Sequence, residues 1–399
     1  MAKFSDLSVD LIYVIFSHLQ SDKPQLHNIS LSCRRFRDVA QRFIVRNASI
    51  HSRKGSRTKL FLRTLIERPD LVVHVHRLEL DLFREVVHWP TEQQNILQIT
   101  RRLNNLREFC YRSLDHKAWH FCIPQPLIWR REGSHDHIRR VEWHQNMAPG
   151  DLWACMELPR IDSILCGELQ DNASHTSTSF NLPAWKHKTS SLTDLEIGTQ
   201  YSLTIDSLRI LLHSPRSLKK ITFISRGYFK EMISPDALAR LLEPVKDSLE
   251  ELSIEIYNSS LPPASQPTDL SAFKSLRKLS VPFRYVFGRD AQVPYHADDF
   301  LPPRLDDLKL SFAPSKSPKR TKATSQNFKV LLGWLKDMDT KKGAHLRLPM
   351  LTDVTLQLNP FLGPFPDLDD VLLQETLEYW NATTKGKVDD SRLSIKCRQ

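Results

Sequence analysis

Glycine is scarce in this chain, with 11 among 399 residues. Loops that hold nucleotide phosphates need glycines at fixed spacing, and neither a P-loop nor a dinucleotide-binding fingerprint is present. The serine nucleophile elbow, the His-Glu-x-x-His motif and the protein-kinase motifs are also missing. We therefore expect a protein that is not itself an enzyme and that uses no cofactor.

Long hydrophobic runs are lacking as well. The longest apolar stretch near the N-terminus, Leu11 to Phe16, is preceded by Asp6 and Asp10. It is too short for a membrane span and unlike a secretion signal. We expect an intracellular protein of the cytoplasm, the nucleus or both, without a membrane partner. The six cysteines show no paired spacing, as expected for reduced and mostly buried thiols.

The charge balance is moderately basic, with 56 Lys and Arg against 46 Asp and Glu. A basic excess is one signature of nucleic-acid binding. Here the basic residues are spread through the chain instead of being concentrated on one predicted element. This distribution favours a mildly basic globular protein, and nucleic acid is not the expected partner.

The N-terminal 46 residues read as a small helical module with surplus apolar surface. Ser8 can cap the first helix and Pro24 can open the second. Apolar residues recur at one-turn spacing on the first helix and again on a later one. They are Leu11, Ile12, Ile15, Phe16 and Leu19, and then Phe36, Val39, Ala40, Phe43 and Ile44. So few residues cannot enclose all these side chains, so either the rest of the chain or a partner must cover them.

Two stretches of this module resemble the F-box, the module that docks substrate receptors onto the Skp-type adaptor of cullin–RING ubiquitin ligases. They are Leu7-Ser8-x-Asp10-Leu11-Ile12-x-x-Ile15-Phe16-x-x-Leu19 and Leu31-Ser32-Cys33-Arg34-Arg35-Phe36-Arg37. The family usually begins with Leu-Pro, and here Ser8 stands in the proline place. The resemblance implies contact with the adaptor, and through it a cullin, by Leu7, Leu11, Ile12, Ile15, Phe16, Leu19, Leu26, Leu31, Cys33 and Phe36. The alternative is a helical cap folded onto the following domain.

After residue 70 a short pattern, apolar-x-x-apolar-x-apolar, returns ten times. Its middle residues are Leu78, Phe109, Val141, Ile164, Leu195, Ile221, Leu252, Leu279, Leu308 and Val354. The steps are about 23–32 residues, and then 46, near the length of leucine-rich repeats. Each instance ends in the alternation of a strand with one buried face. Helical patterns lie between them at 59–67, 93–103, 206–213, 236–245 and 328–338.

This alternation predicts an α/β fold in which parallel strands line a concave face and helices lie outside. The expected domains are a helical module at 1–50 and repeats at 51–399. The asparagine typical of leucine-rich repeats is mostly missing, so the repeats are degenerate. The whole chain resembles a fungal-type F-box/leucine-rich-repeat protein. That resemblance implies a substrate-recognition subunit of an SCF-type ubiquitin ligase, whose repeats bind an unidentified target protein. The alternatives are a repeat scaffold without ligase role and, for the fold, an unrelated α/β domain.

The segment at 313–326 has no large apolar residue and four basic ones. It cannot bury enough surface to order itself, so we expect a mobile basic loop. Its 319–322 run is a weak signal for nuclear import or phosphate binding, and a solvated loop is favoured.

The region from 110 to 144 is rich in cysteine and histidine, with Cys110, His116, His120, Cys122, His135, His137 and His144. Zinc ligands usually come in evenly spaced pairs, and these do not. We therefore expect no metal, and we interpret the region as packing between the helical module and the first repeats. Five of the eight tryptophans lie at 89–153, so an aromatic target-binding surface is the alternative.

Charged pairs occupy equivalent places in four consecutive repeats. They are Lys219-Lys220, Glu250-Glu251, Arg277-Lys278 and Asp306-Asp307, and their sign alternates. Strands stacked in register would make opposite charges neighbours. We interpret these residues as a self-neutralising charge ladder, with a polar binding stripe as the alternative.

Overall fold

The computed structural model describes residues 7–52, 56–82, 89–113, 136–169, 187–199, 205–225, 234–256, 267–288, 299–312, 330–331, 333–334, 348, 351, 353–358 and 394–398. The chain divides into two compact units. The first comprises Met1–Gly167 with Ser190–Leu192, and the second comprises Glu168–Thr189 with Thr193–Gln399.

The first unit begins with three helices, α1 (Val9–His18), α2 (Lys23–Ser32) and α3 (Arg34–Arg46). The Ser8 hydroxyl accepts a hydrogen bond from the Leu11 amide at 3.2 Å, which confirms the predicted cap of α1. Asp22 caps α2, and Pro24 lies in the first turn as predicted. The core of this helical module consists of Ile12, Phe16, Leu26, Val39, Ala40 and Phe43.

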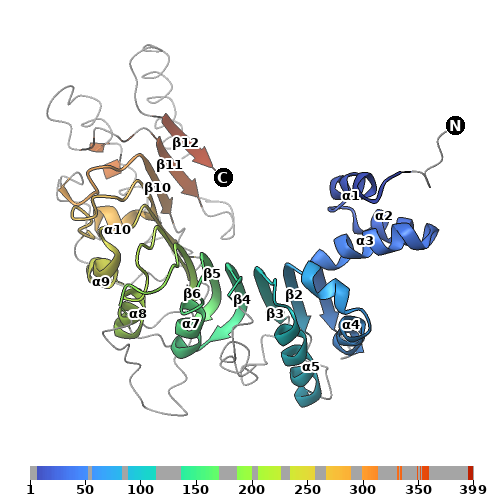
Figure 1. The fold of residues 1–399 in the computed structure, drawn as a ribbon. Helices are drawn as coiled ribbons and strands as arrows, with labels where there is room; N and C mark the ends of the chain where they lie inside the picture. The colour runs from blue at the N-terminus through green and yellow to red at the C-terminus, as the bar shows by residue number, and fades with distance from the viewer. Residues whose placement is uncertain are drawn as a thin grey trace, which may run out of the picture. The chain divides into compact units, whose positions relative to one another are not determined.

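A parallel sheet follows directly. Its strands are β1 (Asn47–Ser52), β2 (Arg77–Leu82), β3 (Glu108–Ser113), β4 (Arg140–Met147) and β5 (Ser163–Leu169). Neighbours along the chain are neighbours in the sheet, and β1 to β4 pair in parallel. The connections contain α4 (Ser56–Glu67), η2 (Pro69–His74), α5 (Trp89–Arg102) and α7 (Pro149–Met156). Helix α4 packs on α5 and β1 (Figure 1).

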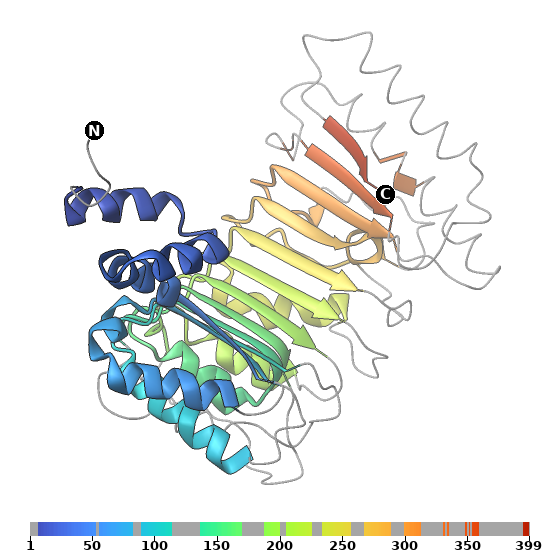
Figure 2. The same ribbon diagram turned by 90° about the vertical axis from the view of Figure 1, so that its right-hand side faces the viewer.

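The second unit repeats the same plan. It contains strands β6 (Asp194–Thr199), β7 (Lys220–Ser225), β8 (Glu251–Ile256), β9 (Lys278–Pro282), β10 (Asp307–Phe312), β11 (Asp353–Leu358) and β12 (Ser394–Arg398). They lie side by side in chain order, all parallel (Figure 2). Its described helices are α8 (Ile205–Leu212), α9 (Pro235–Leu242), η4 (Glu243–Val245) and α10 (Phe283–Phe287). Each unit is thus a solenoid-like α/β arrangement.

The strand register follows the repeat pattern. In the first unit Leu78 pairs with Phe109, and Phe109 pairs with Val141. In the second unit the paired series is Leu195, Ile221, Leu252, Leu279, Leu308 and Val354. All nine side chains are buried. The expected parallel stacking of the repeats is therefore confirmed for these strands. Two further strands, β1 and β12, lie beyond the ten predicted instances, and β1 begins inside the first 50 residues.

Small polar side chains connect successive repeats just before the apolar residues that lead into each strand. Ser248 Oγ donates to the Leu218 carbonyl at 2.9 Å, and Ser275 Oγ donates to the Asp247 carbonyl at 2.7 Å. Asn105 Nδ2 and Ser191 Oγ make equivalent bonds in the first unit, at 2.9 and 2.7 Å. Each of the four residues directly precedes the first apolar residue of a repeat. These bonds satisfy backbone carbonyls in the turns that would otherwise lack a hydrogen-bond partner.

Some of the sequence predictions concern residues that the structure does not describe. The basic segment 313–326 and most of the predicted helix at 328–338 lie outside the described residues, as do His116, His120, Cys122 and His135.

Candidate docking surface

Helix α1 carries apolar residues around much of its circumference, with Asp10, Ser17 and His18 as polar exceptions, and only one apolar side of it is covered. Ile12 and Phe16 are buried in the core of the helical module. Leu11, Val14 and Ile15 are 52%, 53% and 39% exposed. A surface helix of a globular protein normally turns its apolar residues toward the core and its polar residues toward solvent. We call these three residues the apolar face of α1.

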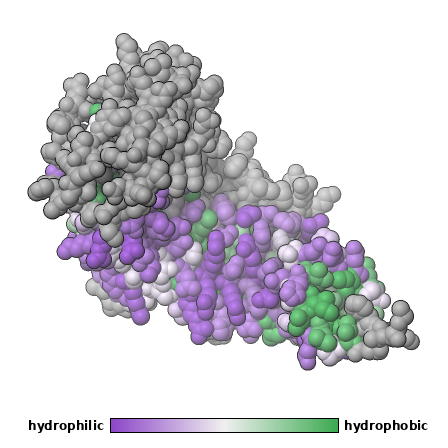
Figure 3. Space-filling model, turned by 90° about the horizontal axis from the view of Figure 1, so that it is seen from above, coloured by the Kyte–Doolittle hydropathy of each residue, from purple (hydrophilic) through white to green (hydrophobic). Residues whose placement is uncertain are grey.

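Further exposed apolar residues lie in the same module. Val9 and Tyr13 on α1 are 49% and 39% exposed, and Leu31 at the end of α2 is 63% exposed. Figure 3 shows hydrophobic side chains gathered at the end of the first unit that carries α1, beside surfaces that are mostly hydrophilic. Contiguous exposed apolar surface of this kind typically marks a protein-interaction site.

The ten residues expected to contact an adaptor fall into three groups. Four are exposed: Leu11, Ile15, Leu31 and Cys33. Three are partly buried: Leu7, Leu19 and Phe36. Three are buried: Ile12, Phe16 and Leu26. The buried three belong to the core of the module, and the exposed four lie on its surface. Contact with an adaptor stays a prediction for all ten.

Polar contacts hold the helical module on the first repeats. Lys23 Nζ donates to the Asn47 carbonyl at 2.6 Å, which ties α2 to the start of β1. Arg68 before η2 donates to Gln41 Oε1 on α3 at 3.0 Å and forms a salt bridge with Asp70 at 2.9 Å. Its hydrogen bond to Asp70 raises the pKa of Arg68, although burial works in the opposite direction. The module is thus anchored while the apolar face of α1 stays exposed.

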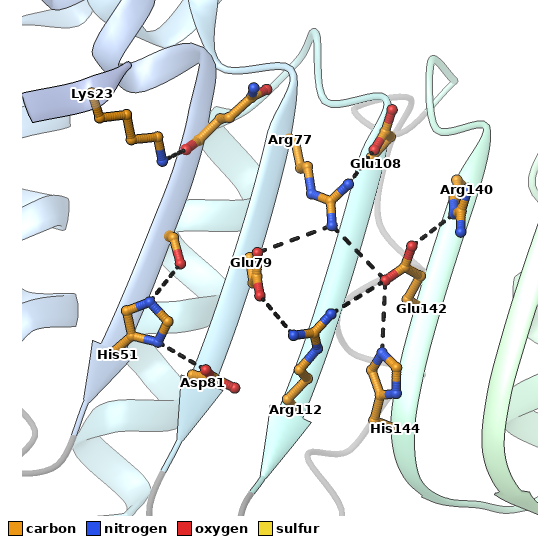
Figure 4. Close-up of polar contacts among 12 residues, drawn as sticks. Lys23, His51, Arg77, Glu79, Asp81, Glu108, Arg112, Arg140, Glu142 and His144 are labelled. Atoms are coloured by element: carbon orange, nitrogen blue, oxygen red, sulfur yellow. Dashed lines mark hydrogen bonds and ion pairs between the residues drawn. The ribbon is translucent and has the colours of Figure 1, made fainter. Parts of the chain in front are cut away.

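Outward-facing charges form a network across β2 to β4 (Figure 4). Arg77 pairs with Glu108 at 3.0 Å, and Arg112 pairs with Glu79 at 3.2 Å. Arg140 Nε lies 2.7 Å from Glu142 Oε1. Burial works to raise the pKa of Glu142, but the hydrogen bond from Cys110 and the charge of Arg140 lower it overall. These charges neutralise one another, so they leave no strongly positive or negative patch. We therefore interpret the network as a contribution to the stability of the sheet.

The predicted charge ladder is present in the second unit. Lys219 Nζ lies 3.1 Å from Glu250 Oε1, and Lys278 Nζ lies 2.6 Å from Glu251 Oε1. The strand register pairs Lys278 with Asp307 as well. The hydrogen bond to Glu251 raises the pKa of Lys278. The opposite charges are therefore neighbours, as the sequence predicted.

Reversing the central pair of the ladder should destabilise the second unit. In a Glu250→Lys, Glu251→Lys variant, three basic pairs would follow one another across the repeats. We expect a loss of about 1–2 kcal/mol in the free energy of unfolding, larger at low salt, because exposed pairs are individually weak and screened. Urea unfolding at two salt concentrations measures this loss.

Making Lys219, Lys220, Arg277 and Lys278 acidic in the same chain should restore part of the lost stability. Unchanged stability at low salt would contradict the ladder, and unchanged stability with lost target binding would favour a binding stripe.

The cysteine- and histidine-rich region contributes Trp143 to the core and a group of polar side chains to the outward face of the sheet. Trp143 is buried and stacks on Tyr111 with ring centroids 4.3 Å apart, so it belongs to the core and not to an aromatic surface. Cys110, Glu142 and His144 meet on the outward face of β3 and β4. The spacing of cysteines and histidines does not predict the part that Glu142 plays in this cluster. The signal that would have found it is the repeat register, which places Glu142 opposite Cys110.

A glycine on the neighbouring strand supports this cluster. A Cβ atom on Gly167 of β5 would lie 2.6 Å from the His144 carbonyl carbon. Only glycine therefore permits β5 to pass this close to the backbone of His144.

Within the described part of the chain, no helix combines the length and the apolar character needed to cross a membrane. No protein-family model matches the chain, and no curated protein matches it significantly.

Proposed function

We propose that this protein is the substrate-recognition subunit of an SCF-type cullin–RING ubiquitin ligase. Its N-terminal helices act as an F-box that binds a Skp-type adaptor, and its degenerate leucine-rich repeats bind a target protein. The chain carries no catalytic group in this scheme. It brings the target near a charged ubiquitin-conjugating enzyme, and proximity raises the rate of transfer to the target's lysines.

The exposed apolar face of α1 is the observation that supports the proposal best. Leu11, Val14 and Ile15 remain uncovered although the module is packed on the first repeats. Burying an exposed aliphatic side chain completely contributes about 1.5–3 kcal/mol, and these three are already about half buried, so a partner gains about half of that from each. Leu11 and Ile15 belong to the motif that resembles the F-box, which makes a Skp-type adaptor the partner we expect.

A scaffold without ligase role is the second candidate, because the helical module also caps the first strand. Lys23 and Arg68 join it to the repeats, as a terminal cap would be joined. A pure cap, however, has a polar outer face. The apolar outer face of α1 favours the receptor.

The decisive experiment removes the apolar face of α1 without touching the core. We expect Leu11→Asp with Ile15→Asp in the full chain to weaken binding to a purified Skp-type adaptor at least 100-fold. Two half-exposed side chains that contribute about 0.7–1.5 kcal/mol each would be replaced by carboxylates, which must also lose water on binding. Isothermal titration calorimetry and co-purification measure the change.

Leu60→Asp is the matched control, because Leu60 on α4 is 56% exposed and lies outside the motif. It should bind the adaptor like the unaltered protein. Both proteins should keep their circular dichroism spectra and melting temperatures. Undiminished adaptor binding by the double variant would refute the F-box proposal, and an equal loss in Leu60→Asp would show unspecific apolar adhesion.

A further inference from the structure

Three side chains of metal-binding type meet on one face of the sheet of the first unit. Cys110 on β3 lies opposite Glu142 on β4 in the strand register. His144 follows two residues later on β4 and so points to the same face. One ligand atom from each of the three lies within 4.8 Å of the others. Paired strands position all three residues, and strands hold a site more rigidly than loops.

The distances are close to those of a metal centre. Tetrahedral zinc with bonds of about 2.0–2.3 Å keeps its ligand atoms about 3.3–3.8 Å apart. His144 Nε2 and Glu142 Oε2 are already 3.7 Å apart. Arg140 Nε holds the other carboxylate oxygen, Oε1, at 2.7 Å (Figure 4). A hydrogen bond of this kind commonly orients a ligating carboxylate.

Burial and access also fit. Cys110 and Glu142 are 1% and 7% exposed, whereas His144 is exposed. A metal ion can therefore enter from solvent beside His144 and keep one coordination position open. Burial, followed by the charge of Glu142, raises the pKa of Cys110 to about 12.

The surrounding charges select the type of metal. Arg77 and Arg112 lie 3.9 and 4.0 Å from Glu142 Oε2. Their positive charges repel a cation, so only a metal that forms strong bonds to its ligands can bind here. Ca²⁺ and Mg²⁺ prefer several oxygen ligands, and only one carboxylate is offered here. A thiolate and an imidazole instead suit zinc and its neighbours. We propose that Cys110, Glu142 and His144 form a three-ligand site for Zn²⁺ or another thiophilic divalent cation.

Cobalt titration tests the thiolate ligand directly. The full chain, stripped with a chelator, should bind one Co²⁺ and develop the near-ultraviolet absorption band of a thiolate–cobalt bond, which Zn²⁺ should then abolish. Cys110→Ser should lose the band. Cys166→Ser is the matched control, because Cys166 on β5 is also 1% exposed but lies outside the cluster, and it should keep the band.

His144→Ala provides a second measurement that does not disturb a buried position. We expect it to weaken Zn²⁺ binding at least tenfold in competition with a chromophoric chelator. Absence of the cobalt band, survival of the band in Cys110→Ser, or an unchanged Zn²⁺ affinity in His144→Ala would each overturn the proposal.

Discussion

Replacing Phe16 with aspartate is expected to unfold the helical module, with a loss of about 4–5 kcal/mol. Phe16 is 3% exposed and meets Phe36 edge to face, with ring centroids 5.8 Å apart. Truncating a buried phenylalanine alone costs about 3–5 kcal/mol, and a carboxylate in the same place adds the cost of leaving water. Loss of helical circular dichroism and faster amide exchange in α1 to α3 measure the effect.

Ile15→Asp is the control for this variant, because Ile15 is the preceding residue and is 39% exposed. Its stability should change by no more than about 0.5 kcal/mol. Both variants should lose adaptor binding, but only Phe16→Asp should lose helix. A fully helical Phe16→Asp protein would show that Phe16 faces solvent and that the core of the module is assigned wrongly.

The second large effect is expected in the core of the first sheet. Trp143→Ala should lower the free energy of unfolding by about 3–5 kcal/mol, because Trp143 is 1% exposed and stacks on Tyr111 and Phe109. Urea unfolding and the loss of near-ultraviolet circular dichroism measure it.

Arg139→Ala is the matched control, since Arg139 is exposed and directly precedes the same strand. Its stability should stay within about 0.5 kcal/mol of the unaltered protein. A loss below 1 kcal/mol in Trp143→Ala would place the indole outside the core and contradict the strand register around it.

Local periodicity explains which elements could be predicted. The apolar residues of α1 and α3 recur at one-turn spacing, and the repeats alternate as strands do. Strand β1 was missed because it follows α3 directly, without a turn signal, and because its buried Ala48 is small. Strand β12 was missed because Arg392 stands where the pattern needs its first apolar residue, three positions before Ile395, which pairs with Val354.

The metal-ligand cluster escapes prediction for a different reason. Cys110 and Glu142 are 32 residues apart and meet only across two strands, so spacing along the chain does not reveal them. The register needed to bring them together was already implied by the alignment of Phe109 with Val141. The same alignment correctly placed Glu251 beside Lys278.

The sequence by itself determined the helical module, the parallel repeats and the alternating charges, because each depends on periodicities that short segments carry. Only the tertiary structure decided which side of α1 is covered. Ile12 and Leu11 are equally apolar neighbours in sequence, yet one is buried and the other is exposed. The difference arises because α3 packs against one side of α1 and Leu26 of α2 joins the same core, and the direction of this packing between helices is recorded in no local pattern.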